Sequence, residues 1–319
     1  MMNIEKPSNS SHVLSVHGAT PKNKCVTPIF FDALAYNIDK SNEKIAYEEL
    51  EINARQIKPK IITVAATFYP KFLDFKKVSD IAKNNNAYFF MDISEISGSV
   101  AAGIIPSPFE GPDGAVIFYR KNVCNAKSDQ EIACKIEERI NQAVSRLQDC
   151  SYGTIAAIAA AMKNINTPQF VEYQKHLVKN TKELSQILSE IYTILMGENM
   201  HFVVIDLHLS GINADQAEKV FNAANISCTK CYLPEDNSFN PYGIKLGMAT
   251  LTTHKSHLSD EDFDKITKFI HKGLFIAREI YCIAKDENKD FDEILTSEKT
   301  ILEQIDVLKN QVECLVQAL

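Results

Sequence analysis

The sequence has no excess of positive charge and no long apolar run. Its 34 Lys and Arg residues are outnumbered by 41 Asp and Glu residues, which gives a formal net charge of -7 at pH 7. Such a surface offers no general positive field for a phosphate backbone. The longest apolar runs, ITVAA and TIAAIAAAM, are far shorter than the ~20 residues of a membrane-spanning helix. We therefore expect no nucleic-acid partner and no membrane span.

Signals for export and for disulfide or zinc chemistry are also lacking. The first residues, MMNIEKPSNSSH, contain no apolar stretch of the kind that secretory signals have, so we expect a protein that is not secreted. The eight cysteines are scattered, which indicates reduced thiols. Only Cys228 and Cys231 form a C-x-x-C pair, and ISCTKCYL has the pattern of a strand and not of a helix start. We interpret this pair as incidental, because a zinc ribbon needs a second pair.

The chain is long enough for one large domain or two ordinary ones. It has 319 residues, of which 45% are hydrophobic. Apolar runs at 59–67 and 87–94 are separated by a charged, helix-like segment, and a third run follows at 115–120. Strand, helix and strand in succession predict a parallel βαβ unit.

The second half of the chain alternates helix and strand patterns. Residues 131–148 and 154–165 have helical spacing, and a long amphipathic helix is expected to start at Thr167 with Pro168 in its first turn. Three short strands are then expected within 201–209, 225–231 and 243–249, with helices that start near Asn213 and Ser259. The last thirty residues repeat apolar positions at helical spacing, so they could cover this α+β unit or meet a partner helix.

Several motifs in this order resemble serine hydroxymethyltransferase. They are VHG at 16–18, IFFDALAYNID at 29–39, DISEISGSVAAGIIPSPFE at 92–110, FYRK at 118–121, QFVEYQKHLVKN at 169–180 and GIKLG at 243–247. The resemblance covers nearly the whole chain. It implies a dimeric or tetrameric enzyme dependent on pyridoxal phosphate, which interconverts serine and glycine with tetrahydrofolate as the one-carbon carrier.

The resemblance also implies the fold and its division. The expected fold class is α/β, of the aspartate aminotransferase-like type found in pyridoxal phosphate-dependent transferases, with an incomplete large domain and an α+β C-terminal domain. We expect a remnant of the cofactor-binding domain at 1–165, a connecting helix at 166–190 and a small domain at 191–319. Relative to the family, the chain is expected to start late. The family has cytosolic and mitochondrial forms, so we expect a cytoplasmic or mitochondrial protein.

Some of the family's cofactor-binding positions are retained. By resemblance, Asp92 is the acid that pairs with the pyridine nitrogen, and it follows a predicted parallel strand, where α/β proteins place ligand groups. His17 matches the histidine that stacks on the cofactor ring. Thr67 replaces a serine near the phenolic oxygen and keeps a hydroxyl donor. Alternatively, Asp92 is a strand-end residue that caps the following turn. His17 is then a solvated residue with no role in cofactor binding.

Other positions depart from the family pattern. Glu95 stands where the family has histidine, and a second carboxylate beside Asp92 would raise the pKa of one of the two. Lys245 replaces the arginine that holds the substrate carboxylate, and a lysine cannot form the same pair of parallel hydrogen bonds. Alternatively, Lys245 is a strand-end residue with no binding role. Asp149 lies where the family binds the cofactor phosphate, and its charge would repel that phosphate.

The largest departure lies between Glu110 and Gly111. By resemblance, about a dozen residues are missing here: a strand and the threonine-rich run that ends in the lysine of the Schiff base. The nearest lysine, Lys121, follows the next strand. We therefore assign no catalytic residue and no metal site, and expect binding of pyridoxal phosphate to be weak or lost.

Three hypotheses follow for the function. The first is a pseudoenzyme that binds or regulates an intact serine hydroxymethyltransferase, in a hetero- or homo-oligomer. The second is an active glycine hydroxymethyltransferase with rearranged residues. The third is a truncated or mis-spliced product of such an enzyme, since the loss of one strand and its loop resembles a skipped segment.

Overall fold

The structure is a computed structural model of the chain. It describes residues 36, 38–39, 44–65, 74–93, 95–107, 115–118, 142, 152–165, 167–196, 199–233, 236 and 240–319. The chain forms two compact units, Met1–Gln174 and Lys175–Leu319, and the boundary falls within one long helix. The helix predicted for 131–148 lies outside the described residues except for Gln142.

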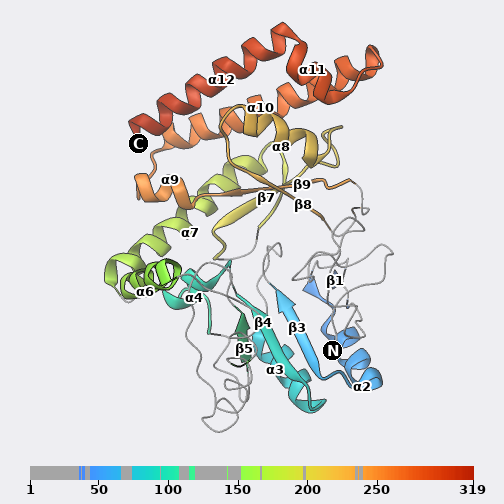
Figure 1. Ribbon diagram of the computed structural model, residues 1–319, viewed down its shortest axis with the longest axis vertical. Helices are drawn as coiled ribbons and strands as arrows, with labels where there is room; N and C mark the ends of the chain where they lie inside the picture. The colour runs from blue at the N-terminus through green and yellow to red at the C-terminus, as the bar shows by residue number, and fades with distance from the viewer. Residues whose placement is uncertain are drawn as a thin grey trace. The chain divides into compact units, whose positions relative to one another are not determined.

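The first unit contains short strands and helices (Figure 1). In chain order its elements are β1 (Ile38–Asp39), β2 (Lys44–Ile45), α2 (Tyr47–Ile57), β3 (Ile61–Ala65), α3 (Phe75–Asn84), β4 (Tyr88–Asp92), α4 (Ser97–Ala101), β5 (Ala115–Phe118), α6 (Tyr152–Ile165) and the start of α7 (Pro168–Ser189). The predicted βαβ unit is confirmed, because β3 and β4 pair in parallel and α3 connects them.

The core of this unit lies between the parallel sheet and α3. Ile62, Phe89 and Met91 are buried on the strands, and Val78 and Ile81 are buried on α3. A hydrogen bond of 3.0 Å from the amide of Lys77 to the carboxylate of Asp74 caps the start of this helix. These apolar side chains have the periodicity from which the sequence predicts strand, helix and strand.

Strand β5 pairs directly with β4. The two strands are parallel, with Phe89 opposite Ala115 and Asp92 opposite Phe118. The sheet therefore has the order β3-β4-β5 among the described strands. By resemblance, one more strand would be expected between the segments that form β4 and β5. Direct pairing satisfies backbone groups of β4 that a missing neighbour would otherwise leave exposed.

Tyr36 is packed beside strand β3. Its side chain is completely buried, and its hydroxyl donates a hydrogen bond of 2.8 Å to the carbonyl oxygen of Thr63. Burial raises the pKa of Tyr36 above its ordinary value, and the charge of Tyr47 adds to this. The phenol is therefore held as a neutral donor, which satisfies a buried carbonyl of the sheet.

The second unit is an antiparallel sheet covered by helices. Beyond the C-terminal part of α7, its elements are β6 (Thr193–Leu195), β7 (Phe202–Asp206), α8 (Ala214–Ala223), β8 (Thr229–Cys231), β9 (Gly243–Gly247), α9 (Ala249–His254), α10 (Asp260–Asp286), α11 (Phe291–Ser297) and α12 (Lys299–Ala318). The strand order is β6-β7-β9-β8, and each neighbouring pair is antiparallel. The three strands predicted from the sequence are present, and β6 is an additional short strand at one edge.

Helices α8 and α10 begin at the residues that the sequence predicts. Asn213 and Gln216 form a reciprocal capping box at the start of α8, as do Ser259 and Asp262 at the start of α10. Burial alone would raise the pKa of Asp262, but hydrogen bonds from Lys255 and Ser259 lower it to about 2. Such caps satisfy N–H groups that have no partner within the helix.

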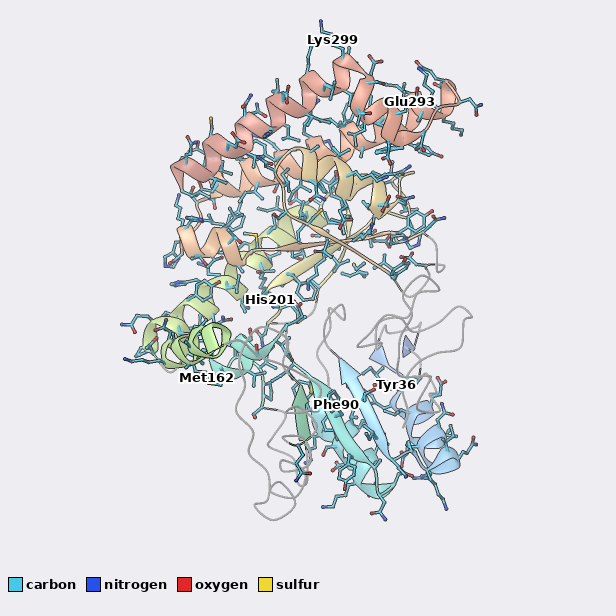
Figure 2. The ribbon with its side chains drawn as sticks, in the orientation of Figure 1. Tyr36, Phe90, Met162, His201, Glu293 and Lys299 are labelled. Carbon is cyan, nitrogen blue, oxygen red and sulfur yellow. The ribbon has the colours of Figure 1, made fainter. Side chains whose placement is uncertain are left out.

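The C-terminal segment folds back over the same unit. It forms two helices where the sequence indicates one continuous pattern, because the backbone of Glu298 is extended between them. In Figure 2, Glu293 and Lys299 lie on either side of this break. Helix α12 packs on α10 and α8, with Ile301, Ile305 and Leu308 buried. The segment thus covers the α+β unit, which is one of its two expected roles.

Gly273 allows α8 and α10 to approach closely. A Cβ atom at this position of α10 would lie 2.4 Å from Cε1 of Phe221, a completely buried ring on α8. We expect Gly273→Ala to destabilise the chain by about 1–3 kcal/mol, because an added methyl group forces a completely buried ring to shift. Gly247→Ala is the matched control, since a Cβ there meets no atom within 4 Å. Chemical denaturation of both variants measures the difference, and equal stabilities would contradict this packing.

Candidate functional site

The strand-end position of Asp92 is as predicted. It is the last residue of β4, opposite Ala65 of β3 and Phe118 of β5, so it lies at the carboxyl edge of the parallel sheet. This edge is where open α/β sheets bind their ligands. Its side chain is outside the part of the chain that the structure describes, as are residues His17 and Thr67. The cofactor roles of these three residues stay predictions.

Glu95 lies in the turn that connects β4 to α4. Glu95 is half-buried. A hydrogen bond of 3.0 Å from the amide of Ile96 to the carbonyl of Ile93 closes the turn. Glu95 therefore follows Asp92 within the same short connection, as the motif predicts. A carboxylate at this position adds negative charge to the sheet edge that carries Asp92.

Helix α4 is fixed beside this turn by Gln174. A Cβ atom on Gly98 would lie 2.7 Å from Nε2 of Gln174, and the hydroxyl of Ser99 donates a hydrogen bond of 3.4 Å to Oε1 of Gln174. Ser99 and Gln174 are buried. The small residues of the SGS motif therefore allow α7 to pack closely against α4, and this contact supports the connection that holds Glu95.

Lys245 belongs to the other unit, at the centre of β9. It is half-buried, and its Nζ lies 4.2 Å from the centre of the Phe202 ring on the neighbouring strand β7. A cation over a buried aromatic ring is attracted by the electrons of the ring. The ammonium group therefore has an aromatic contact within its own sheet, and the substrate-binding role of Lys245 stays a prediction.

The C-x-x-C pair consists of a buried thiol, Cys231, and a half-buried one, Cys228. Burial raises the pKa of Cys231 to about 12, and the charge of Lys245 opposes this while that of Asp236 adds to it. Burial also raises the pKa of Cys228 to about 12, with a further contribution from Glu218. The segment forms β8 and does not open a helix. Thiols with raised pKa values are poor nucleophiles and poor metal ligands.

A further polar cluster lies at the end of β7, and the sequence analysis did not identify it. The ring of His208 lies between the carboxylates of Asp206 and Asp236 and stacks on the ring of Tyr242. Asp206 and His208 are two residues apart, but Asp236 and Tyr242 come from the connection between β8 and β9. An Asp-x-His pattern at a strand end is the only sequence signal for this cluster, and it is a weak one.

Two classes of site have no support within the described ranges. No group of three or more His, Cys, Asp and Glu side chains in them is arranged to hold a metal ion. No helix in them is long and apolar enough to cross a membrane. Of the predicted site residues, Asp92 and Glu95 lie at the edge of the sheet in the first unit, and Lys245 lies beside the Phe202 ring in the second.

Fold and site together define the class of protein. A parallel sheet with an aspartate at its carboxyl edge, followed by a long helix and an α+β unit, is an incomplete aspartate aminotransferase-like fold, the fold type I of pyridoxal phosphate-dependent enzymes. Comparison with protein families matches residues 2–270 to the family described as Serine hydroxymethyltransferase.

Curated relatives agree with this match. Serine hydroxymethyltransferase of Bombyx mori is 35% identical over 333 residues, which cover 98% of this chain and 71% of the relative. The cytosolic enzyme of Oryctolagus cuniculus is 34% identical over 340 residues, covering 98% of this chain and 69% of the relative. The mitochondrial enzyme of Schizosaccharomyces pombe is 32% identical over 295 residues, covering 86% and 60%. The chain belongs to the serine hydroxymethyltransferase family.

Proposed function

We propose that this chain does not catalyse the family reaction itself and acts as a binding or regulatory partner of an intact serine hydroxymethyltransferase. One observation carries the proposal. Strand β4 pairs directly with β5, and the sequence from Asp92 to Arg120 contains no lysine. By the family pattern, the lysine that holds pyridoxal phosphate should come from this part of the chain. The residues present therefore do not fit a covalently held cofactor.

Two further substitutions support a loss of catalysis. Glu95 adds a carboxylate to the connection that follows Asp92, where the family has histidine. Lys245 replaces the arginine that holds the substrate carboxylate, and a single ammonium group cannot reproduce a planar, two-bond contact. The change at Glu95 weakens binding of the cofactor, and the change at Lys245 weakens binding of the amino acid. Neither change compensates for the missing lysine.

The exposed surface of α6 supports a role in assembly. From Ala156 to Asn164, every side chain of this helix that the structure describes is exposed, and Ala156, Ala157, Ala159, Ala160, Ala161 and Met162 are apolar. Met162 lies on this helix in Figure 2. A helix with so many exposed apolar side chains is typical of a surface that another chain covers. An intact family member is the proposed partner, because the residues that match the family, 2–270, include this helix.

The proposed partner role also implies where in the cell this chain is located. The relatives include proteins named cytosolic and mitochondrial. A regulatory partner has to share the compartment of the enzyme that it binds, so we propose a cytoplasmic or mitochondrial location for this chain.

Co-expression with an intact serine hydroxymethyltransferase from the same cells tests the partner role. We expect the two chains to elute together in size-exclusion chromatography, with a light-scattering mass that requires both. Met162→Glu should weaken the complex by about 30-fold or more, because it places an unpaired charge in an apolar interface. Ile52→Glu is the matched control, since Ile52 is an exposed apolar residue on α2 of the same unit.

Two results would contradict the partner role. One is a stable monomer whose elution and mass do not change in the presence of the intact enzyme. The other is a complex that both glutamate variants weaken equally, which would assign the contact to a surface other than α6.

A further inference from the structure

Helices α10 and α12 each expose a large apolar side chain near the seam between them. After the turn through α11, helix α12 runs back along α10 and packs against it (Figure 1). Phe275 on α10 is 54% exposed, and Val307 on α12 is 56% exposed. Single exposed apolar residues are ordinary on a protein surface. Two of them indicate a contact surface only if they lie together.

A polar bridge across the seam places Phe275 and Val307 on the same side. Gln304 of α12 accepts a hydrogen bond of 2.7 Å from Nζ of Lys272 and donates one of 3.0 Å to Oε2 of Glu279, and both partners are on α10. Phe275 is three residues from Lys272 and four from Glu279, and Val307 is three residues from Gln304. Residues three or four apart are neighbours on the surface of a helix. The two apolar side chains therefore flank the bridge on one side of the helix pair.

Contacts beneath and beside this face fix its shape. Ile276 of α10 and Ile305 of α12 are buried below it. Nζ of Lys272 lies 5.3 Å from the centre of the Phe275 ring. At the edge of the face, Nδ1 of His271 lies 2.7 Å from the hydroxyl oxygen of Tyr192, just before β6. A surface that already has its bound shape loses little entropy when it binds.

The two helices carry opposite charges around the apolar residues. The exposed positions of α10 at one-turn spacing carry two cations and no anion; they are Lys268, His271, Phe275 and Arg278. Lys268 and Arg278 form no ion pair within the part of the chain that the structure describes. On α12, Glu303 and Asp306 are exposed beside Val307. Lys299 approaches Glu303 only to 3.8 Å, and both side chains are mostly exposed, so this pair is weak. The face thus has a basic half on α10 and an acidic half on α12.

A face with one basic half and one acidic half is complementary to a second copy of itself. In a two-fold dimer, the same surface of each copy faces the other copy. An axis that runs parallel to the two helices, above the seam, places α10 of each copy over α12 of the other. Basic positions then face acidic ones on both sides of the axis, and Phe275 and Val307 are covered between them. A partner of a single charge would match only one half.

We propose that this face, formed by Phe275, Val307 and the charged residues beside them, is a contact surface between two copies of the chain. Gln304 lies between Lys272 and Glu279, so it marks the level along the seam that is midway between these two residues. Because the helices are antiparallel, Arg278 and Glu303 are displaced from this level in the same direction. The axis keeps these levels, so Arg278 of one copy meets Glu303 of the other. Aromatic residues and Arg are enriched in protein interfaces.

The proposed contact does not depend on the proposed partner role. The face belongs to the second unit, whereas α6 belongs to the first. Met162→Glu is directed at α6, and charge reversals on α10 or α12 are directed at the contact between copies. Failure of one proposal is therefore distinguishable from failure of the other.

Sedimentation velocity of the full chain over a range of concentrations tests the contact. We expect a reversible equilibrium between monomer and dimer that weakens as the salt concentration rises, because its charge pairs lie near the surface. Arg278→Glu should raise the dissociation constant about tenfold or more, because it places two acidic side chains opposite each other. Glu303→Arg should do the same with two cations. The double variant restores opposite charges, so its dissociation constant should return to within about threefold of that of the unchanged chain.

Lys182→Glu is the matched control, because Lys182 is an exposed cation on α7 of the same unit. It should leave the dissociation constant unchanged. Thermal unfolding reports whether each variant is folded, and all three substituted residues are exposed. A chain that stays monomeric up to about 100 μM would overturn the proposal and leave the face to a different partner. So would a dimer that neither single reversal weakens, or a double variant that associates as weakly as the single ones.

Discussion

Borohydride reduction of this chain with pyridoxal phosphate should leave no single lysine stoichiometrically modified. The segment from Asp92 to Arg120 contains no lysine, and its two strands are direct neighbours in the sheet. Surface lysines react reversibly with any aldehyde, so reduction should produce low labelling spread over many positions. A family enzyme with its lysine in place concentrates the label at one position, because the site holds the aldehyde next to that amine.

Peptide mapping by mass spectrometry measures the distribution of the label. An intact serine hydroxymethyltransferase treated in parallel is the positive control. Lys121 is the lysine nearest to the expected position, so Lys121→Arg tests whether it has taken over this role. A single peptide labelled stoichiometrically in the unchanged chain, and lost in Lys121→Arg, would mean that the cofactor is held after all.

The sequence predicts the regular elements of both units because their signals are local. The apolar runs around β3 and β4 have the length and flanking helices of a parallel unit, and Asn213 and Ser259 stand at the starts of α8 and α10. These patterns depend on residues within one or two turns of each other. The cap at Thr167 is of the same kind, with its hydroxyl accepting from the amide of Phe170 at 3.3 Å.

Two features of the fold could not be predicted in this way. Strand β6 has only three residues and is held by pairing with Val204, Ile205 and Asp206 of β7, so its strand character comes from the sheet and not from its own pattern. The break at Glu298 interrupts a sequence whose apolar spacing continues through it. Packing against α10 and α8 decides the direction of α12, and this contact is distant in sequence.

Some features of the candidate site were likewise predictable from local sequence, and others were not. The strand-end position of Asp92 and the β9 position of Lys245 follow from local patterns and a family resemblance. The contact of Lys245 with Phe202 depends on the register between β7 and β9, which places Lys245 opposite Val204. The His208 cluster depends on the same pairing and on the path of the connection before β9. No local pattern specifies that path, so the cluster could be found only in the structure.

The rate of serine cleavage by an intact serine hydroxymethyltransferase, measured at increasing concentrations of this chain, tests the central claim most directly. The chain alone, with pyridoxal phosphate and tetrahydrofolate, should give no rate above the same mixture without protein. When it is added to the intact enzyme, the rate should change saturably, by about fivefold or more if the coupling is of ordinary strength. Met162→Glu should shift the change to higher concentrations, and Ile52→Glu should not. Turnover by the chain alone would contradict the loss of catalysis, and an intact enzyme whose rate stays constant over the whole range would contradict the regulatory role.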